Sequence, residues 1–287
     1  MRPSLDDLVF LTSNAGKARE AAALLGRPVE ARSLDIPEIQ SLDFAEVVTA
    51  KALAAAAELG VPVLVEDSGL SLPAWKGYPG PLTKFAVGAV GEAGFARLAH
   101  AWGDPRAEAV STLGLAWPGA STPEVVVASG RVAGTLAPEP RGSNGFGWDV
   151  IFVPEGETRT FAEMTAVEKN ARSHRARAFA ELTREIREKF LTTSGSLMKE
   201  LGRLLLRAHE LCEQHGTSFG DYVDRVLGLP RTSAQVIMKA HRLDLDPRVG
   251  FENMRQLTAI RDDGDRAKAQ AALLSGRTPD MVKAAYG

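Results

Sequence analysis

The residue types best suited to chemistry gather near the middle of the chain, in the segment Gly145-Phe146-Gly147-Trp148-Asp149. Its two aromatic side chains provide flat faces for stacking a nucleobase, and its aspartate can accept a hydrogen bond from a ring N–H. Donors for phosphate or carbonyl oxygens follow at Lys169, His174 and Arg175. This mixture of residues predicts one half of a nucleotide site.

A turn of small residues, Thr12-Ser13-Asn14-Ala15-Gly16-Lys17, separates an apolar run from a helical pattern. Backbone N–H groups at such a strand-to-helix turn bind anions, and Lys17 adds a positive charge. The segment is not a Walker A loop, because the earlier glycine is missing and Ala18 stands where Ser or Thr follows the lysine. Taken alone, an ordinary strand-to-helix turn remains the alternative.

Carboxylates follow the buried run 61–65, in Glu66-Asp67-Ser68-Gly69. Such a position lies at the usual ligand crevice of an open sheet, where Asp67 can hold Mg²⁺ and Ser68 can contact a phosphate. A loop aspartate followed by a Ser-Gly turn is the alternative. Four more charged residues are candidates, although each taken alone is typical of a solvated surface: Glu38, Glu46, Lys51 and Lys84.

As a set, these residues resemble the inosine triphosphate pyrophosphatase family. The resemblance runs in order across about residues 8–190 and rests on four motifs. They are Ser-Asn-x-Gly-Lys-x-x-Glu, Val-Glu-Asp-Ser-Gly-Leu, Tyr-Pro-Gly-Pro with a following lysine, and Phe-Gly-Trp-Asp with Glu-Met-x-x-x-Glu-Lys-Asn-x-x-Ser-His-Arg. The last of the four is the most specific. One departure is Leu82, which replaces a common aromatic residue beside Pro-Gly-Pro.

The resemblance implies hydrolysis of deaminated purine nucleoside triphosphates (ITP, dITP and XTP) to the monophosphate and pyrophosphate, with Mg²⁺. It also implies a homodimer, and an elongated mixed sheet with flanking helices and a central nucleotide cleft. Glu38 and Asp67 would bind the metal, while Asp67, Lys17 and Glu46 would serve catalysis. The substrate would contact Thr12, Ser13, Asn14, Ala15, Gly16, Lys17, Lys51, Ser68, Lys84, Phe146, Gly147, Trp148, Asp149, Lys169, His174 and Arg175.

The chemistry of the base agrees with this resemblance. Hypoxanthine presents N1–H as a donor, which suits Asp149, and O6 as an acceptor, which suits His174 and Arg175. Adenine reverses both features, so each mismatch leaves a buried polar group without a partner, at a cost of about 1–3 kcal/mol.

For the reaction we expect water to attack the α-phosphorus, activated or positioned by Asp67. A pyrophosphatase for other modified nucleotides, such as methylated pyrimidines, is an alternative.

Composition and charge narrow the class of protein. The 287 residues are 45% apolar and 24% charged with a net charge of −2, which is typical of a globular protein and gives no case for whole-chain binding to nucleic acid or membrane. Cys212 is the single cysteine, so an intramolecular disulfide is excluded. We find no signal-peptide pattern and no membrane-spanning run, and expect a cytoplasmic protein.

Short β-like runs alternate with helical patterns over residues 1–190, which predicts an α/β domain. We expect strands at about 8–11, 61–65, 112–117, 124–128 and 150–153, and helices at about 16–25, 43–59, 91–102 and 174–190. The polar segment Leu191-Thr192-Thr193-Ser194-Gly195-Ser196 predicts a joint between this domain and an all-helical domain over 191–287.

The C-terminal domain shows a helix–turn–helix pattern over about 219–240, with Thr232 or Ser233 as the expected cap of the second helix. Such a module would present Arg231, Gln235, Lys239 and Arg242 to a DNA groove. The alternative function is therefore a nucleotide-sensing, DNA-binding regulator. A helical module for a protein partner or for dimerisation is the other interpretation, since any small bundle needs capped, amphipathic helices.

Overall fold

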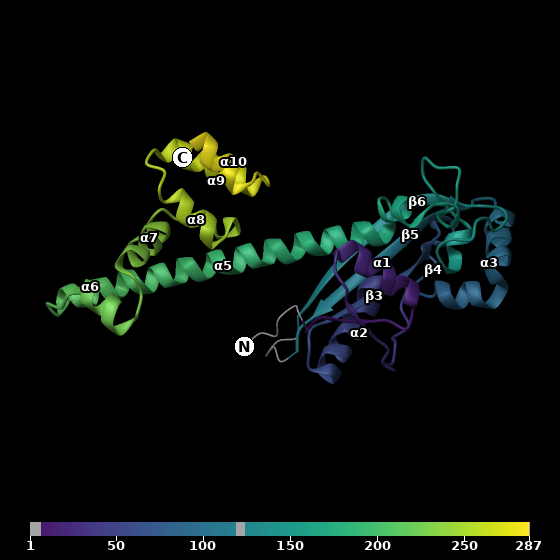
Figure 1. Ribbon diagram of the computed structural model, residues 1–287, viewed down its shortest axis with the longest axis horizontal. Coiled ribbons are helices and arrows are strands. Elements are labelled where there is room, and N and C mark those ends of the chain that lie inside the picture. The colour runs from purple at the N-terminus through teal and green to yellow at the C-terminus, as the bar shows by residue number, and fades with distance from the viewer. Residues whose placement is uncertain (1–6, 119–123, 287) are drawn as a thin grey trace. The chain divides into compact units, whose positions relative to one another are not determined.

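The computed structural model describes residues 7–118 and 124–286 and divides into two compact units, Met1–Glu185 and Ile186–Gly287. The first unit is built on a mixed sheet with helices, and the second is helical (Figure 1). The predicted fold class, α/β followed by an all-helical region, is confirmed. The domain boundary after residue 190 stays a prediction.

Within the described residues, one seven-stranded sheet has the order β2-β1-β3-β5-β6-β7, with β4 paired to β3. β1 is parallel to β2 and β3, and the remaining pairs are antiparallel. The strands are β1 Val9–Leu11, β2 Glu30–Arg32, β3 Val63–Ser71, β4 Pro79–Gly80, β5 Arg106–Ala116, β6 Val125–Leu136 and β7 Phe152–Pro154. The five predicted runs overlap β1, β3, β5, β6 and β7, although the first two residues of the run 150–153 belong to η3 and its cap. The short strands β2 and β4 were not predicted.

Capping residues explain where the helices of the first unit begin and end. Asn14 and Asp43 cap α1 and α2 with their side chains, and Gly26 and Gly60 end these helices in the left-handed region. α3 begins eight residues before its predicted start and is kinked at Gly91. The helices are α1 Ala15–Leu25, α2 Phe44–Leu59, α3 Thr83–Ala101, α4 Ala166–Asn170 and the 3₁₀ turns η2 Pro73–Trp75, η3 Gly147–Val150 and η4 Phe161–Glu163.

Two apolar clusters hold the sheet in place. One packs α2 against β1 and β3 through residues such as Val48 and Val65, and the other packs α3 against β5, β6 and the η3–η4 region. β3 belongs to both clusters, because its first half contacts α2 and its second half carries Leu70. The middle of this strand, Glu66 to Ser68, is therefore held from both ends.

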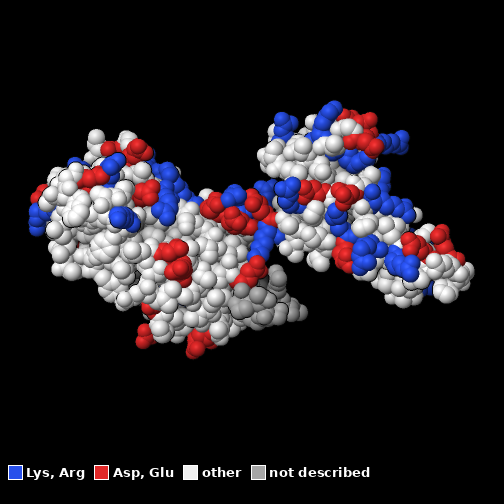
Figure 2. All heavy atoms as spheres, turned by 180° about the vertical axis from the view of Figure 1, so that it is seen from behind, with Lys and Arg blue, Asp and Glu red and all other residues white. Residues whose placement is uncertain are grey.

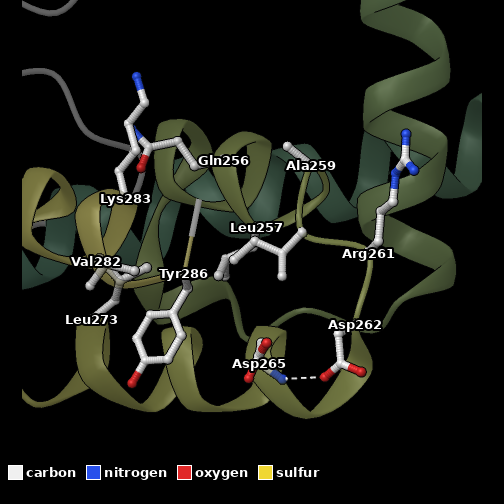
Figure 3. Close-up of a pocket in the computed structure, with 11 residues that line it drawn as sticks. Gln256, Leu257, Ala259, Arg261, Asp262, Asp265, Leu273, Val282, Lys283 and Tyr286 are labelled. Carbon is white, nitrogen blue, oxygen red and sulfur yellow. Dashed lines mark hydrogen bonds between the residues drawn. The ribbon is translucent and has the colours of Figure 1, made fainter.

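The second unit is a bundle of helices around its own apolar core, which includes Met198, Ile237 and Met254. A pocket of about 500 Å³ lies among α8, α9 and α10, with the buried Leu257 and Val282 on its wall (Figure 3). The elements are α6 Phe219–Asp221, the π-helical η5 Tyr222–Val226, α7 Arg231–Arg242, η6 Pro247–Val249, α8 Phe251–Leu257, α9 Asp263–Leu274 and α10 Pro279–Tyr286.

The predicted joint residues, Leu191–Ser196, form no break between helices, because they lie inside one long helix, α5 His174–Gln214 (Figure 1). The small residues Ser194 and Gly195 allow close packing against other parts of the second unit. A Cβ on Gly195 would lie 2.0 Å from the carbonyl oxygen of Pro247, and the Ser194 hydroxyl accepts a hydrogen bond from the Phe251 backbone N–H at 3.2 Å. Tertiary contacts thus outweigh the weak helix propensity of glycine, serine and threonine.

The predicted helix–turn–helix is also corrected in detail. α7 begins at Arg231 after Pro230, so neither Thr232 nor Ser233 caps it, and the preceding helix ends as a short π turn. Arg231 is exposed but forms ion pairs with Asp221 and Asp224. Acidic and basic side chains are interleaved on the face of this unit seen in Figure 2. The DNA-binding alternative gains no support from these features.

None of the described helices is long and apolar enough to cross a membrane.

Candidate functional site

The turn between β1 and α1 is organised by Asn14. Its side-chain oxygen accepts hydrogen bonds from the backbone N–H groups of Gly16 at 2.8 Å and Lys17 at 3.1 Å, and its own N–H donates to the Thr12 hydroxyl at 3.1 Å. Two of the N–H groups expected to face a phosphate are therefore engaged by Asn14 in this structure. The ammonium of Lys17 is the charged group that the turn offers.

Gly16 brings this turn against the aromatic segment. A Cβ at this position would lie 2.4 Å from the Phe146 ring, so no other residue fits without displacing it. The Phe146 ring lies close to two cations, with its centroid 4.9 Å from the Lys169 Nζ and 5.5 Å from the Arg175 Cζ. The structure thus joins the predicted turn and the predicted aromatic segment, which are far apart in the sequence.

Asp149, the last residue of the aromatic segment, is a buried hydrogen-bond acceptor. Its Oδ2 accepts from the Phe146 N–H at 2.8 Å and from the Lys169 Nζ at 2.6 Å, and the side chain is buried. Burial raises the pKa of Asp149, while the charge of Lys169 acts in the opposite direction. Gly145 has a φ of 73°, and a Cβ there would lie 2.3 Å from the Asp149 Oδ2. One oxygen of the carboxylate expected to bind the base therefore also fixes the loop.

Arg175 is buried and bound on two sides by carboxylates. Its Nη2 lies 2.7 Å from the Glu66 Oε1, its Nε lies 2.9 Å from the Glu66 Oε2, and its Nη1 pairs with Glu20. Burial opposes the charge on Glu66, but Arg175 and Lys17 outweigh this effect and lower the pKa of Glu66 to about 2. Glu66 also accepts from the Ser111 hydroxyl at 3.0 Å.

Glu20 completes a chain of alternating charges, because it also binds the Lys169 Nζ at 2.8 Å. The chain runs Asp149, Lys169, Glu20, Arg175, Glu66 and joins α1, β3, η3, α4 and α5. Neither Glu20 nor Glu66 was predicted as a site residue. The sequence signal that could have found Glu20 is its position one helical turn after Lys17. Glu66 comes directly before Asp67 on a strand, so these two side chains point to opposite faces of the sheet.

His174 lies among aromatic rings. Its ring centroid is 5.2 Å from that of Trp148 and 5.9 Å from that of Phe161. It is 1% exposed, and neither ring nitrogen has a hydrogen-bond partner in the protein. Burial and the charges of Arg175 and Lys169 lower its pKa well below the ordinary value, so the ring is neutral. A buried polar side chain without a partner points to a ligand that supplies one.

The second group of predicted residues surrounds Asp67. Burial raises the pKa of Asp67 to about 6, against the opposing charges of Lys17 and Lys51 and the Ser68 N–H, which donates to it at 3.0 Å. Burial also lowers the pKa of Lys17. The pKa of Asp67 is therefore closer to neutral pH than its ordinary value, which suits a group that exchanges protons.

Glu38 and Lys51 form an ion pair, and the charge of Glu38 contributes to the raised pKa of Asp67. Two carboxylates that interact in this way supply the oxygen ligands that Mg²⁺ prefers, since this ion takes one or two carboxylates and completes its shell with water and phosphates. The residues present therefore fit the expected metal, although no cluster of three or more acidic, His or Cys ligands occurs among the described residues.

Two predicted residues are not joined to this group. Glu46 is exposed on the first turn of α2 and accepts from the Ser41 hydroxyl at 2.7 Å. Lys84 is exposed on the first turn of α3, and in the described part of the chain no interaction links it to Asp67 or Glu38. Its neighbour Thr83 is buried and bonded to Leu70 of β3, so this turn is fixed to the strand that carries Asp67.

Comparison with known proteins covers the first unit. The Ham1 family model matches residues 8–185. A dITP/XTP pyrophosphatase of Methanopyrus kandleri is 42% identical over 180 residues, which are 61% of this chain and 94% of the relative. An inosine triphosphate pyrophosphatase of Yarrowia lipolytica is 41% identical over 185 residues, covering 63% of this chain and 96% of the relative.

Solved structures agree with these relatives. A HAM1 protein from Coxiella burnetii matches with a TM-score of 0.52 and 30% identity, over 62% of this chain and 97% of that chain. The relatives are thus covered almost to their full length, and the C-terminal region of this chain lies beyond them. Since the family model matches more than half of the chain and includes every predicted site residue, this protein belongs to the Ham1 family.

Proposed function

We propose that this chain hydrolyses deaminated purine nucleoside triphosphates (ITP, dITP and XTP) to the monophosphate and pyrophosphate. Its activity would remove miscoding precursors from the nucleotide pool. Relatives named dITP/XTP pyrophosphatase and inosine triphosphate pyrophosphatase support this proposal. The observation that carries it is the neutral, buried His174, whose two ring nitrogens lack partners beside Trp148 and Phe161.

The charges around this aromatic group favour a 6-oxopurine. Lys169 and Arg175 carry only donors, and a neutral imidazole has one donor to offer as well. A carbonyl at position 6 of the base accepts from such groups, whereas the amino group of adenine would bring a further donor. Leaving one buried polar group without a partner costs about 1–3 kcal/mol, which corresponds to a preference of about fivefold to 150-fold.

Glu38 and Asp67 would hold the metal at the phosphate end. When bound there, Mg²⁺ would neutralise phosphate charge and stabilise the pyrophosphate that leaves. Lys17 and Lys51 would contribute donors to the same phosphates. Lys84 stays a proposed phosphate contact and Glu46 a proposed catalytic neighbour.

The reaction follows from the properties of Asp67. A carboxyl with a pKa of about 6 is ionised at pH 7.5 and accepts a proton more readily than an ordinary aspartate. It would take a proton from a water molecule while the water oxygen forms a bond to the α-phosphorus. The bond from the α-phosphorus to the bridging oxygen breaks, and pyrophosphate leaves with its charge opposed by Lys17.

The test is turnover by the purified full chain of dITP and XTP against ATP and dGTP with Mg²⁺, separating pyrophosphate from phosphate as the product. We expect a preference of at least tenfold for dITP or XTP, with pyrophosphate released. Equal turnover of ATP, or release of phosphate alone, would contradict the proposal. Binding of dITP without turnover would instead favour a sensor.

We also propose a homodimer formed through the first unit, acting in the cytoplasm. Large apolar side chains are exposed on α3 and at its C-cap, and Phe85, Leu98 and the cap residue Trp102 are the largest of these. A Phe85→Glu/Trp102→Glu variant should halve the mass of the full-length assembly in sedimentation. An unchanged mass would exclude this surface as the dimer interface.

Imaging of the tagged full chain in its cell of origin tests whether the protein acts in the cytoplasm.

A further inference from the structure

The part of α5 in the second unit leaves a line of large apolar side chains exposed. Phe190, Leu197, Leu201, Leu204 and Leu211 are exposed by 70, 67, 38, 49 and 39%. The line is continued by two smaller residues, Ser194 and Ala208, which are half-buried. We call these seven residues the leucine stripe. A contiguous apolar surface of this kind marks an interaction site rather than ordinary surface.

The spacing of the leucine stripe is that of a coiled coil. Its members are separated alternately by four and three residues, from Phe190 to Leu211. The mean spacing is therefore 3.5 residues, which keeps a stripe on one side of a supercoiled helix. The face of α5 that packs most closely on its own unit is a different one, since Met198, Leu205 and Cys212 are buried one residue after each of three leucines. Ser194, at the edge of the stripe, also contacts that unit through the Phe251 N–H.

We propose that two copies of this chain pair through the leucine stripe, with their α5 helices antiparallel. In this alignment Leu201 packs against Leu204 of the partner subunit, and Leu197 against Ala208 of the partner subunit. Each small member of the stripe then faces a large one, which fills the layers evenly. A parallel pair would instead place serine on serine and alanine on alanine, and would leave gaps beside the leucine layers.

The charges beside the stripe support the same alignment. Glu200 and Arg207 are exposed beside the stripe, on the side away from the core of the unit, and each also pairs with a neighbour on the same helix, Arg203 and Glu210. In the antiparallel pair the layer of Leu201 brings Glu200 next to Arg207 of the partner subunit, and the two-fold axis repeats this contact. A parallel pair places both residues opposite buried apolar positions. The stripe is therefore complementary to a second copy of itself in both size and charge.

The first test is the mass of the full chain in sedimentation equilibrium. A Leu197→Glu/Leu204→Glu variant should have half the mass of the wild-type assembly, because two charges are placed in the middle of the interface. Glutamate is a good helix former, so α5 should be retained, as circular dichroism can verify. A wild-type chain that is monomeric at all concentrations, or a variant of unchanged mass, would overturn the proposal.

A matched control makes the same chemical change elsewhere. Met281→Glu alters a side chain of α10 that is 59% exposed, in the same unit but off the stripe, and should leave the mass unchanged. The Phe85→Glu/Trp102→Glu variant separates this surface from the one proposed on the first unit. A dimer that persists in that variant and dissociates on adding the stripe substitutions would show that the stripe pairs two chains without help from the first unit.

The second test determines whether the two α5 helices run antiparallel or parallel. In a Cys212→Ala background, the chains carrying Leu197→Cys and Ala208→Cys should form a disulfide when mixed, because these positions share a layer. Neither chain alone should do so efficiently, since each cysteine would lie about 16 Å along the axis from its own copy at 1.5 Å per residue. Efficient cross-linking by Leu197→Cys alone would show parallel helices and overturn the alignment.

Discussion

The surroundings of His174 allow its effect on stability to be measured separately from its effect on activity. Its ring is packed between Trp148 and Phe161, but its nitrogens lack partners, which costs the folded state about 1–3 kcal/mol. A His174→Phe variant should therefore be as stable as the wild type or more stable by about 1 kcal/mol. The same change should lower kcat/KM for dITP at least tenfold, because the ring can no longer bond the base.

Thermal denaturation and steady-state kinetics on this one variant check both expectations. Phe161→Leu is a suitable control, since it removes a buried aromatic neighbour and should lower stability. A His174→Phe variant that is less stable and fully active would mean that the nitrogens serve the fold rather than the ligand.

Under the proposed mechanism, Asp67 should give the activity a defined pH dependence. Its pKa of about 6 means that the carboxyl is protonated at pH 5 and ionised at pH 7.5. At low Mg²⁺, kcat/KM should fall as pH decreases through about 6. High Mg²⁺ should move this limb to lower pH, because metal and proton compete for the carboxylate. Pyrophosphate release followed from pH 5 to 8 at two Mg²⁺ concentrations measures it.

The variant Asp67→Asn should lose at least a hundredfold in kcat at pH 7.5, as expected for removal of a general base. Because the folded state raises the pKa of this group, its ionisation opposes folding above about pH 4. The variant should therefore be no less stable than the wild type at pH 7.5. Full activity of this variant at saturating Mg²⁺ would exclude the proposed role of Asp67.

At the scale of elements, the Glu66–Arg175 pair fixes β3 to the start of α5. Removing Glu66 leaves the guanidinium buried without its main partner, so Glu66→Ala should destabilise the first unit by about 3–5 kcal/mol. The pKa of Glu66 is lowered from 4.5 to about 2, so this stabilisation is present above pH 4.5 and is lost as pH falls towards 2.

Urea denaturation of Glu66→Ala, Arg175→Ala and the double variant measures the coupling. The double variant should lose less than the sum of the two single variants, because it removes both charges together. Strict additivity would show that the pair contributes no net coupling.

Gly195 tests whether α5 is fixed by packing. Alanine is the better helix former by about 1 kcal/mol, but its Cβ would lie 2.0 Å from the Pro247 carbonyl oxygen. Gly195→Ala should therefore destabilise the second unit by about 1–3 kcal/mol, as overpacking does. Ser196→Ala, at an exposed position on the same helix, should be neutral or slightly stabilising. The melting temperatures of the two variants measure these effects. A Gly195→Ala variant that is more stable than the wild type would contradict the close contact with Pro247.

The elements show what a single sequence can predict. The long apolar strands and the capped helices α1 and α2 followed from local patterns, because their signals lie within the segments themselves. The stretch 191–196 was interpreted as a joint because the partner that needs its small residues, Pro247, is far along the chain. For the same reason Glu20 and Glu66 were missed as site residues, since their importance depends on Lys169 and Arg175, which only the fold brings near.

At the scale of the whole molecule, each unit has its own apolar core. Calorimetry of the full chain should therefore show two transitions. A non-hydrolysable dITP analogue should raise the temperature of one of them, and Glu66→Ala should lower that same transition. Gly195→Ala should shift the other. A single transition that moves with all three changes would show that the two cores unfold as one.

The buried chain of alternating charges has a consequence for how products leave. Lys169 and Arg175 are already balanced by Asp149, Glu20 and Glu66, so the nucleoside end of the site has little positive charge to spare. Under the proposed function, phosphate would instead meet Lys17, Lys51 and Lys84, together with the proposed Mg²⁺. Under the proposed activity, the nucleoside monophosphate departs readily once the bond is cut, and pyrophosphate is the product that inhibits.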